Sequence, residues 1–208
     1  SWKYAFNGAE PIRAVSIKRF QEAFGPVGFE ASMPCYGLAE STLLVSVRRR
    51  SDSVRTFQLD GLALEDGRVA MGDSTAGTSI REVVSCGAPI PGHDVVIRDP
   101  ETGTRVEPGG VGEITVRGPS VAVGYHKEPG VTKGTFPQTL AGEAGPWLRT
   151  GDLGAFLDGE LVVVGRLKDL LIVDGRNIHP TDIEAVAEES HEAIAPHRSA
   201  AFAVAGED

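Results

Sequence analysis

One carboxylate and two cationic side chains in the second half of the chain are suited to binding a nucleotide. Asp152 follows Thr150-Gly151 in a predicted turn, and a predicted pair of strands leads on to Arg166 and Lys168. An ionised aspartate accepts two hydrogen bonds side by side, which suits the vicinal hydroxyls of a ribose, and a guanidinium suits ribose or phosphate oxygens. These residues predict half of a nucleotide site. The glycine-rich phosphate loop that would form the other half is absent from the 208 residues.

Composition narrows the class of protein. A net charge of −9 argues against nucleic acid or an anionic membrane as the main partner, because both bind clustered lysine and arginine. The basic run 48–50 is interpreted as a solvated helix end. A hydrophobic fraction of 41% can bury the core of one domain or two small ones. The sequence shows no membrane span and no signal peptide, which predicts a reducing, cytoplasmic compartment.

The cysteines and histidines have no spacing typical of a metal site. Cys35 and Cys86 are interpreted as buried thiols. His179, beside Pro180 at the predicted start of a helix, is interpreted as a structural residue rather than a catalytic one.

The first fifty residues have an α/β pattern. Apolar residues at helical spacing predict a helix over 17–24 that ends at Gly25. A loop or short strand is expected over 26–34, a tight turn at Tyr36-Gly37, and an apolar helix over 39–47. Residues 51–82 are polar and glycine-rich after one strand-like stretch, and predict a surface excursion with little core.

Residues 83–167 have the pattern of a small β-barrel or sandwich. Strands are expected over 95–97 and over 112–117, with Ile114 and Val116 buried, and Asp158-Gly159 predicts a hairpin.

A different pattern begins after Asp169. Residues 170–173 predict a strand, and Asp174-Gly175 predicts a turn. Thr181 and Glu184 have the spacing of a capping box that opens a helix. We expect a small α+β unit to begin here, inside which the chain ends.

Four motifs in order resemble the adenylate-forming superfamily, which includes acyl-CoA synthetases, adenylation domains of nonribosomal peptide synthetases and luciferases. They are Asn7-Gly8-Ala9-Glu10-Pro11, Tyr36-Gly37-Leu38-Ala39-Glu40, Thr150-Gly151-Asp152 and Gly165-Arg166-Leu167-Lys168-Asp169. Each motif alone is a weak signal, but four in order cover nearly the whole chain. Residues 36–46, 84–87, 169–177 and 180–184 are most similar to the fatty acyl-AMP ligase branch.

The resemblance implies a fold, and with it a division of the chain. Residues 1–82 would end the α/β part of a large domain, with a branch-specific insertion at about 51–82 that is associated with loss of coenzyme A use. Residues 83–167 would form a distorted β-barrel subdomain. Residues 168–208 would form a hinge and the start of a small C-terminal domain. The phosphate loop would then lie upstream of Ser1 and a catalytic lysine downstream of Asp208.

The resemblance also implies an activity. With ATP and Mg²⁺, a fatty acid would be activated to an acyl-adenylate, and its acyl group passed to the phosphopantetheine thiol of an acyl carrier protein or polyketide synthase carrier domain. A fatty acyl-CoA synthetase and a catalytically inactive structural fragment are the alternatives. Because positioned cations drive attack on the α-phosphate, we expect this segment alone to have no measurable adenylation activity.

The resemblance gives the motif residues their roles. Glu40 would hold Mg²⁺, since that ion keeps several waters and needs few protein carboxylates; the alternative is a carboxylate that only favours a helix start. Tyr36 and Gly37 would contact the adenine. The adenine and acyl-carboxylate region would be lined by Asn7, Gly8, Ala9 and Glu10.

The later motifs would hold the ribose and provide the hinge. Asp152 and Arg166 would bind the ribose. Lys168 would either contact phosphate as a catalytic cation or be solvated. At Asp169 a backbone rotation would reorient the small domain, which requires no side-chain contact with substrate.

Overall fold

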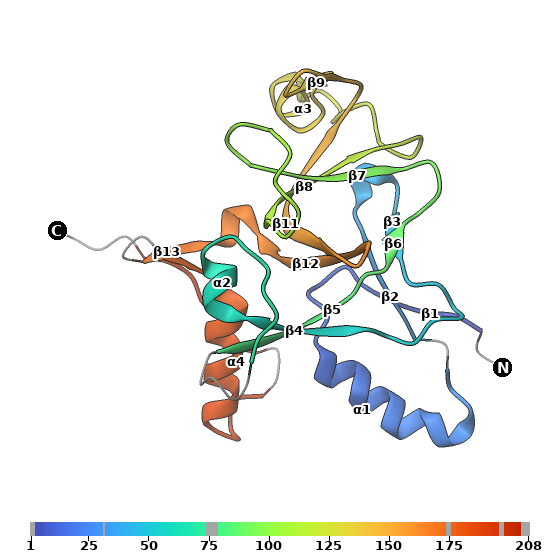
Figure 1. The fold of residues 1–208 in the computed structure, drawn as a ribbon, viewed down its shortest axis with the longest axis vertical. Helices are drawn as coiled ribbons and strands as arrows, with labels where there is room; N and C mark the ends of the chain where they lie inside the picture. The colour runs from blue at the N-terminus through green and yellow to red at the C-terminus, as the bar shows by residue number, and fades with distance from the viewer. Residues whose placement is uncertain (1–2, 31, 74–78, 174–175, 196–197, 205–208) are drawn as a thin grey trace.

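A computed structural model describes residues 3–30, 32–73, 79–173, 176–195 and 198–204 (Figure 1). Its helices are α1 (Ala14–Phe24), α2 (Gly61–Glu65), α3 (Pro129–Thr135) and α4 (Pro180–Ser190), with short 3-10 turns η1 (Gly25–Val27), η2 (Ala39–Ser41) and η4 (Leu167–Asp169). Its strands are β1 (Ala5–Asn7), β2 (Ser32–Gly37), β3 (Leu44–Val47), β4 (Thr56–Asp60), β5 (Ile80–Val84), β6 (Ala88–Pro89), β7 (Asp94–Arg98), β8 (Gly112–Arg117), β9 (Thr139–Leu140), β10 (Glu143–Ala144), β11 (Leu148–Leu157), β12 (Glu160–Arg166), β13 (Leu171–Val173) and β14 (Arg176–Ile178). No helix of the described residues is long and apolar enough to cross a membrane.

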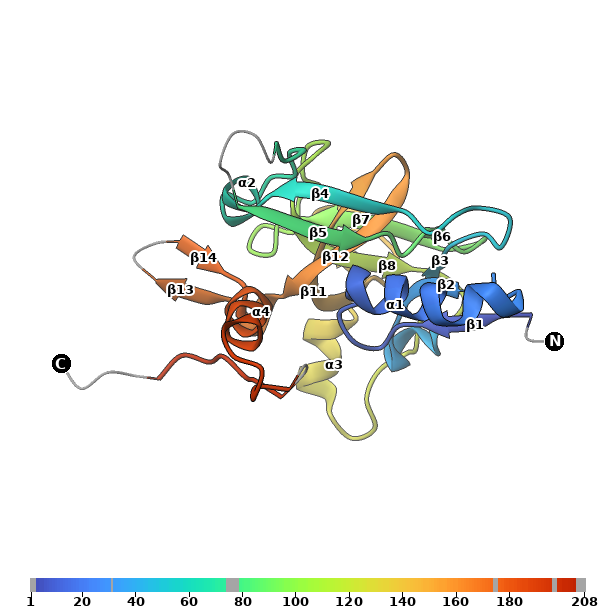
Figure 2. The ribbon, with the colours of Figure 1, turned by 90° about the horizontal axis from the view of Figure 1, so that it is seen from below.

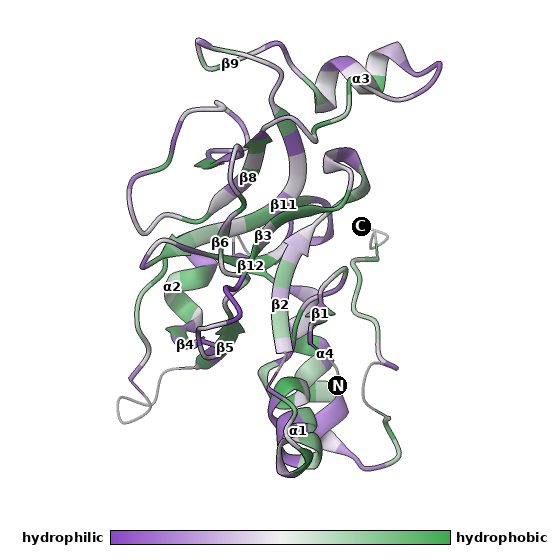
Figure 3. Ribbon diagram, turned by 90° about the vertical axis from the view of Figure 1, so that its right-hand side faces the viewer, coloured by the Kyte–Doolittle hydropathy of each residue, from purple (hydrophilic) through white to green (hydrophobic). Residues whose placement is uncertain are grey.

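Helices lie at opposite ends of the molecule, and the N-terminal and C-terminal elements lie on opposite sides. Figures 1 and 3 show α3 and β9 at one end of the molecule and α1 and α4 at the other, with strands of mixed hydropathy between them. Figure 2 shows β1 on one side, and β13, β14 and α4 on the other.

The N-terminal sheet has the order β1-β2-β3-β6, with β1 parallel to β2 and the other pairs antiparallel. The helix expected over 17–24 is confirmed as α1, but Gly25 continues into η1, and Gly28 adopts the left-handed conformation with φ of 83°. The helix expected over 39–47 is wrong: this stretch forms η2 and then β3. Val45 is fully buried between neighbouring strands, where a β-branched residue packs well.

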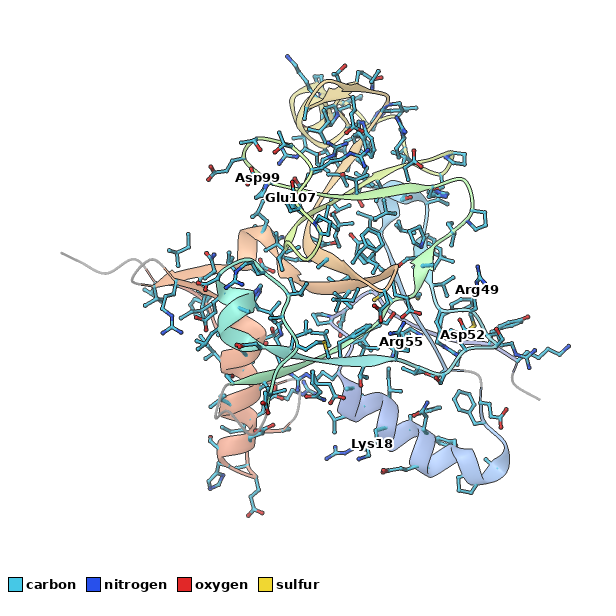
Figure 4. The ribbon with its side chains drawn as sticks, viewed as in Figure 1. Lys18, Arg49, Asp52, Arg55, Asp99 and Glu107 are labelled. Carbon is cyan, nitrogen blue, oxygen red and sulfur yellow. The ribbon has the colours of Figure 1, made fainter. Side chains whose placement is uncertain are left out.

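Two other expectations for this region are also wrong. Tyr36-Gly37 is the end of β2 rather than a tight turn. Arg48 is not solvated at a helix end: its side chain is 5% exposed and donates to the Ser32 carbonyl. Arg49 is exposed and lies near Asp52 in the following turn (Figure 4).

The central sheet has the order β12-β11-β8-β7. The Asp158-Gly159 hairpin is confirmed, with φ of 51° and 79°, as are the strands at 95–97 and 112–117 with Ile114 and Val116 fully buried. The expected barrel is wrong, since the described strands form open sheets. The free edge of β12 is covered by residues 85–87 through the hydrogen bonds Cys86 N to Leu161 O and Leu161 N to Gly87 O, so it does not close on β7.

Residues 51–82 contribute to the core, which corrects the expectation of a surface excursion. β4 pairs with β5, and the Asp60 carboxylate caps α2 by accepting from the backbone N–H groups of Leu62 and Ala63 at 2.9 and 3.3 Å. Phe57 and Leu59 are buried in a cluster with the apolar face of β11 and β12. The strand-like stretch at the start of this region therefore has a packed inner face.

The C-terminal unit is a β13–β14 hairpin followed by α4. The turn expected at Asp174-Gly175 lies outside the described residues. The strand and the helix are confirmed, but the capping box is wrong: α4 starts at Pro180, and the preceding His179 makes no side-chain cap. Proline suits the first helical position because its missing N–H would be unpaired there in any case.

Candidate functional site

Three side chains from different strands meet at the junction of the two large sheets. The Tyr36 hydroxyl on β2 donates to Asp152 Oδ2 on β11 at 2.6 Å, and Arg166 Nε on β12 lies 3.2 Å from Asp152 Oδ1. Asp152 and Arg166 are register partners across the hairpin. The Asp152 side chain is 13% exposed and that of Arg166 is 56% exposed. The structure thus places the two residues side by side, and their binding of a ribose stays a prediction.

Asp152 sits in a distorted part of β11 rather than in a separate turn. The pairing with β8 shifts register between Arg149 and Leu153, and Gly151 has a φ of 72°. Thr150 stabilises the distortion, because its hydroxyl donates to Ile114 O at 2.7 Å and accepts from Asp152 N at 3.1 Å. A bulge of this kind redirects a side chain out of the ladder.

Burial, the charge of Asp152 and the hydrogen bond to it all raise the pKa of Tyr36 well above its ordinary value, in that order of size. Tyr36 therefore stays protonated and acts as a donor at neutral pH. The Tyr36 hydroxyl and the Arg166 guanidinium both contact the Asp152 carboxylate, and these contacts orient it before any ligand binds.

A cleft of about 320 Å³ lies next to this cluster. It is lined by Leu38, Glu40, Glu113, Tyr125, Gly134, Thr135, Leu148, Arg149, Thr150 and Gly151. Its lining includes an ion pair between the half-buried Arg149 and the buried Glu113, in which Arg149 Nη2 lies 2.6 Å from Glu113 Oε2. The backbone N–H of Gly151 also donates to Glu113 Oε1 at 3.1 Å. Glu113 is 3% exposed, so its charge is compensated by these partners rather than by water.

Glu40 lies on η2 at the wall of the cleft. Its Oε1 accepts from the Tyr125 hydroxyl at 2.6 Å. This hydrogen bond is the largest cause of the raised pKa of Tyr125, which therefore keeps its proton and donates it to Glu40. Within the described ranges, no group of three acidic, histidine or cysteine side chains gathers to hold a metal. Of the two acidic residues that line the cleft, Glu113 is paired with Arg149, whereas Glu40 has no cationic partner among the described residues.

The first motif lies at the end of β1, beside the strand that carries Tyr36. A Cβ at Gly8 would come 2.8 Å from the Cys35 carbonyl oxygen, so sheet packing alone requires glycine there. Ala9 has a φ of 70°, which turns the chain away after the strand. Asn7, Ala9 and Glu10 are exposed. Because β1 is parallel to β2, these residues lie at the same end of the sheet as Tyr36 and Gly37.

Lys168 and Asp169 are not brought to the cluster. Both are exposed on η4, and in the part of the chain that the structure describes neither side chain has a hydrogen bond or ion pair. Their neighbours Leu167 and Leu170 pack against the core cluster that contains Phe57 and Leu59 and so anchor this turn.

The structure adds three residues that the sequence did not single out: Glu113, Tyr125 and Arg149. Arg149 had a signal, because it precedes Thr150-Gly151-Asp152 directly. Glu113 and Tyr125 reach the cleft only through tertiary packing, from β8 and from the segment before α3.

A family profile and several known proteins are similar to this chain. The family profile described as AMP-binding enzyme matches residues 1–126. The medium-chain-fatty-acid–acyl-carrier-protein ligase JamA of Moorena producens is 46% identical, over 98% of this chain and 35% of that protein. The putative fatty-acid–CoA ligase fadD25 of Mycobacterium tuberculosis is 42% identical, over 95% of this chain and 34% of its own length.

A solved structure is similar over nearly the whole chain. It is a fatty acyl-adenylate ligase of Legionella pneumophila in complex with acyl adenylate and pyrophosphate, 40% identical with a TM-score of 0.75. The match covers 99% of this chain and 36% of the other. The chain therefore spans about a third of the length of the relatives it matches.

Proposed function

This chain belongs to the AMP-binding enzyme family, and on that basis we propose that it is the ribose-binding segment of a fatty acyl-AMP ligase. In the proposed reaction a fatty acid carboxylate attacks the α-phosphorus of ATP, forming an acyl-adenylate and releasing pyrophosphate. The phosphopantetheine thiol of an acyl carrier protein or polyketide synthase carrier domain then takes the acyl group and releases AMP. The protein would work in the cytoplasm.

The cluster of Tyr36, Asp152 and Arg166 is the observation that carries this proposal. A carboxylate that is 13% exposed and held from two sides is ready to accept two ribose hydroxyls without reorganisation. Arg166 is 56% exposed, so it would contact ribose or phosphate oxygens while it stays paired with Asp152. Tyr36 would both hold Asp152 and offer its ring edge to the adenine, with Gly37 beside it.

The residues of the cleft fit a magnesium ion bound together with ATP. Mg²⁺ keeps several waters and is usually bound by one or two protein carboxylates plus substrate phosphates, and Glu40 supplies one such carboxylate. When bound, the ion would neutralise charge on the phosphates. Glu40 would hold the ion. The charge of Arg149, which also lines the cleft, is already paired with that of Glu113.

The remaining motif residues take subsidiary roles in the proposal. Asn7, Gly8, Ala9 and Glu10 would border the adenine and the acyl carboxylate. Lys168 would approach phosphate only after movement of η4, and Asp169 would be the hinge about which a small C-terminal domain turns. Both side chains are exposed and unpaired within the described ranges, so such a movement would break no contact of theirs, but it would have to displace Leu167 and Leu170 from the core. Residues 51–82 would be the branch-specific insertion.

An acyl-CoA synthetase is the second candidate, and the 42% identity to the protein named fadD25 is the observation in its favour. The higher identity to JamA, whose name specifies an acyl carrier protein, favours the first. The third candidate is a catalytically inactive structural fragment.

The full-length protein that contains this chain should be assayed for fatty-acid-dependent exchange of labelled pyrophosphate into ATP. We then expect thioester formation with holo-acyl carrier protein and little with coenzyme A. Equal or faster thioester formation with coenzyme A would favour the synthetase. Absence of exchange with fatty acids of every chain length would reject both activities.

A further inference from the structure

Glu40 is held from two directions by one short segment, residues 120–125. The Glu40 carbonyl accepts from Ala122 N at 2.8 Å, and the Thr42 hydroxyl donates to Ser120 O at 2.9 Å. These contacts fix the backbone of η2. The carboxylate is held by the end of the same segment, through the Tyr125 hydroxyl at 2.6 Å.

The backbone of η2 needs such support because it is bent sharply. Thr42 has a φ of 62°, a conformation that a β-branched residue rarely adopts. The neighbouring Ser41 is fully buried, and its hydroxyl lies 2.9 Å from that of Ser120. A displacement of the segment 120–125 would therefore also displace Glu40.

Tyr125 is itself firmly placed despite being 38% exposed. Its ring packs edge-on against Phe136, with ring centroids 5.5 Å apart and an interplanar angle of 67°. Phe136 is 3% exposed and belongs to a buried core cluster that also contains Ile114 and Leu148. The backbone N–H of Tyr125 donates to the Thr132 hydroxyl on α3 at 2.9 Å. The hydroxyl thus reaches the cleft from a rigid support.

The geometry has a chemical consequence for the carboxylate. The Tyr125 hydroxyl donates to Oε1 of Glu40. Oε2 of Glu40 has no hydrogen-bond or ion-pair partner among the residues that the structure describes. A carboxylate fixed at one oxygen presents the other in a single orientation. Metal-binding carboxylates are commonly hydrogen-bonded in this way, and losing the outer partner weakens metal affinity.

We propose that Tyr125 is a positioning residue, which orients the Glu40 carboxylate toward a divalent cation bound in the cleft with the nucleotide phosphates. This inference rests on the proposed function, because it takes Glu40 as a cation ligand. It assigns no contact between Tyr125 and the substrate.

The test measures Mn²⁺ binding to the full-length protein in the presence of a non-hydrolysable ATP analogue, by the loss of the free Mn²⁺ paramagnetic signal. Mn²⁺ stands in for Mg²⁺, since both favour carboxylate and water oxygens. We expect Tyr125→Phe to weaken Mn²⁺ binding roughly 10-fold. Glu40→Gln should weaken it at least as much, and adding Tyr125→Phe to Glu40→Gln should change nothing further.

Two comparisons separate positioning from packing. Tyr125→Leu removes both ring and hydroxyl, so the proposal expects it to match Tyr125→Phe in Mn²⁺ affinity. Tyr4→Phe removes a hydroxyl from an exposed ring elsewhere and should leave affinity unchanged. Thermal melting of each variant verifies folding, and Tyr125→Phe keeps the contact with Phe136, so it is expected to melt as the parent does.

The outcomes distinguish this inference from the proposed function. If Glu40→Gln weakens Mn²⁺ binding while Tyr125→Phe binds like the parent, Tyr125 does not position the carboxylate, and the proposed function stands. A normal Tyr125→Phe with an impaired Tyr125→Leu would mean that only ring packing matters, and also overturns the inference. If Glu40→Gln binds Mn²⁺ normally, Glu40 is not a cation ligand, and both ideas about this residue fail.

Discussion

The Tyr36 hydroxyl donates to Asp152 Oδ2 at 2.6 Å and so joins β2 of the N-terminal sheet to β11 of the central sheet. The two residues are 116 positions apart in the chain. Because Tyr36 is 8% exposed and its hydroxyl keeps its proton, the contact fixes the carboxylate in an orientation set by how the two sheets pack. The candidate ribose site is therefore a property of the interface between sheets.

Asp152→Asn in the full-length protein should weaken binding of an acyl-adenylate analogue roughly 10- to 100-fold. The asparagine keeps the shape and one acceptor but loses the charge, and hydrogen bonds to charged groups contribute about 1.5–3 kcal/mol. Isothermal titration calorimetry measures the change. Asp158→Asn, on the exposed turn of the same hairpin, is the matched control and should bind as the parent does. Equal affinity in the two variants would remove Asp152 from the site.

Gly37→Ala should destabilise the protein by about 3 kcal/mol, at the upper end of the usual cost of overpacking. A Cβ at Gly37 would lie 1.7 Å from the Leu43 carbonyl oxygen, so the η2 turn that carries Glu40 would have to move. Gly25→Ala is the control, because no atom lies within 4 Å of its Cβ position and its φ is −54°. Urea unfolding compares the two variants, and equal midpoints would contradict the close approach seen here.

His179 should make the protein less stable in mild acid. Burial, and secondarily the charge of Arg81, lower the pKa of His179 to about 4. In the unfolded chain its pKa is about 6.5, so between these values only the unfolded chain binds the proton. The stability from the neutral imidazole is complete above pH 6.5 and is lost as the pH falls toward 4, by about 3 kcal/mol in all.

Urea midpoints measured between pH 7.5 and pH 4.5 test this expectation. His179→Gln should flatten the pH dependence, whatever its effect on stability at pH 7.5. His191→Gln changes an exposed histidine one helix length away and should keep the slope of the parent. A parent and His179→Gln with parallel pH profiles would contradict the assignment.

Arg81→Gln should loosen α4 from the rest of the molecule. Arg81 Nη2 on β5 donates to Val164 O at 2.6 Å, and its Nε lies 3.3 Å from Asp182 Oδ1 in the first turn of α4. Hydrogen exchange should become roughly 10-fold faster in α4, since local opening would cost about 1.4 kcal/mol less. The control is Arg68→Gln, whose ion pair with Asp66 is local and exposed. Unchanged exchange in α4 would mean that other contacts hold it.

Local signals were reliable where a short stretch forms its own structure. Asp158-Gly159 predicted its hairpin because both residues tolerate a positive φ, and Ile114 and Val116 predicted a buried face by alternation. The stretch 39–47 was misassigned because a short apolar run fits a helix or a buried strand equally well. Here pairing with β2 and β6 decided for a strand.

The chemical groups that this protein can offer follow from its residues alone: the carboxylates Asp152 and Glu40, the cation Arg166 and the order of their motifs. Asp152 and Arg166 face each other because a bulge between Leu153 and Gly154 shifts by one residue the register that the Asp158-Gly159 hairpin sets. The contact of Tyr36 with Asp152 and that of Tyr125 with Glu40 arise from tertiary packing. Those contacts span 116 and 85 positions and depend on how sheets and loops pack, which no local pattern encodes.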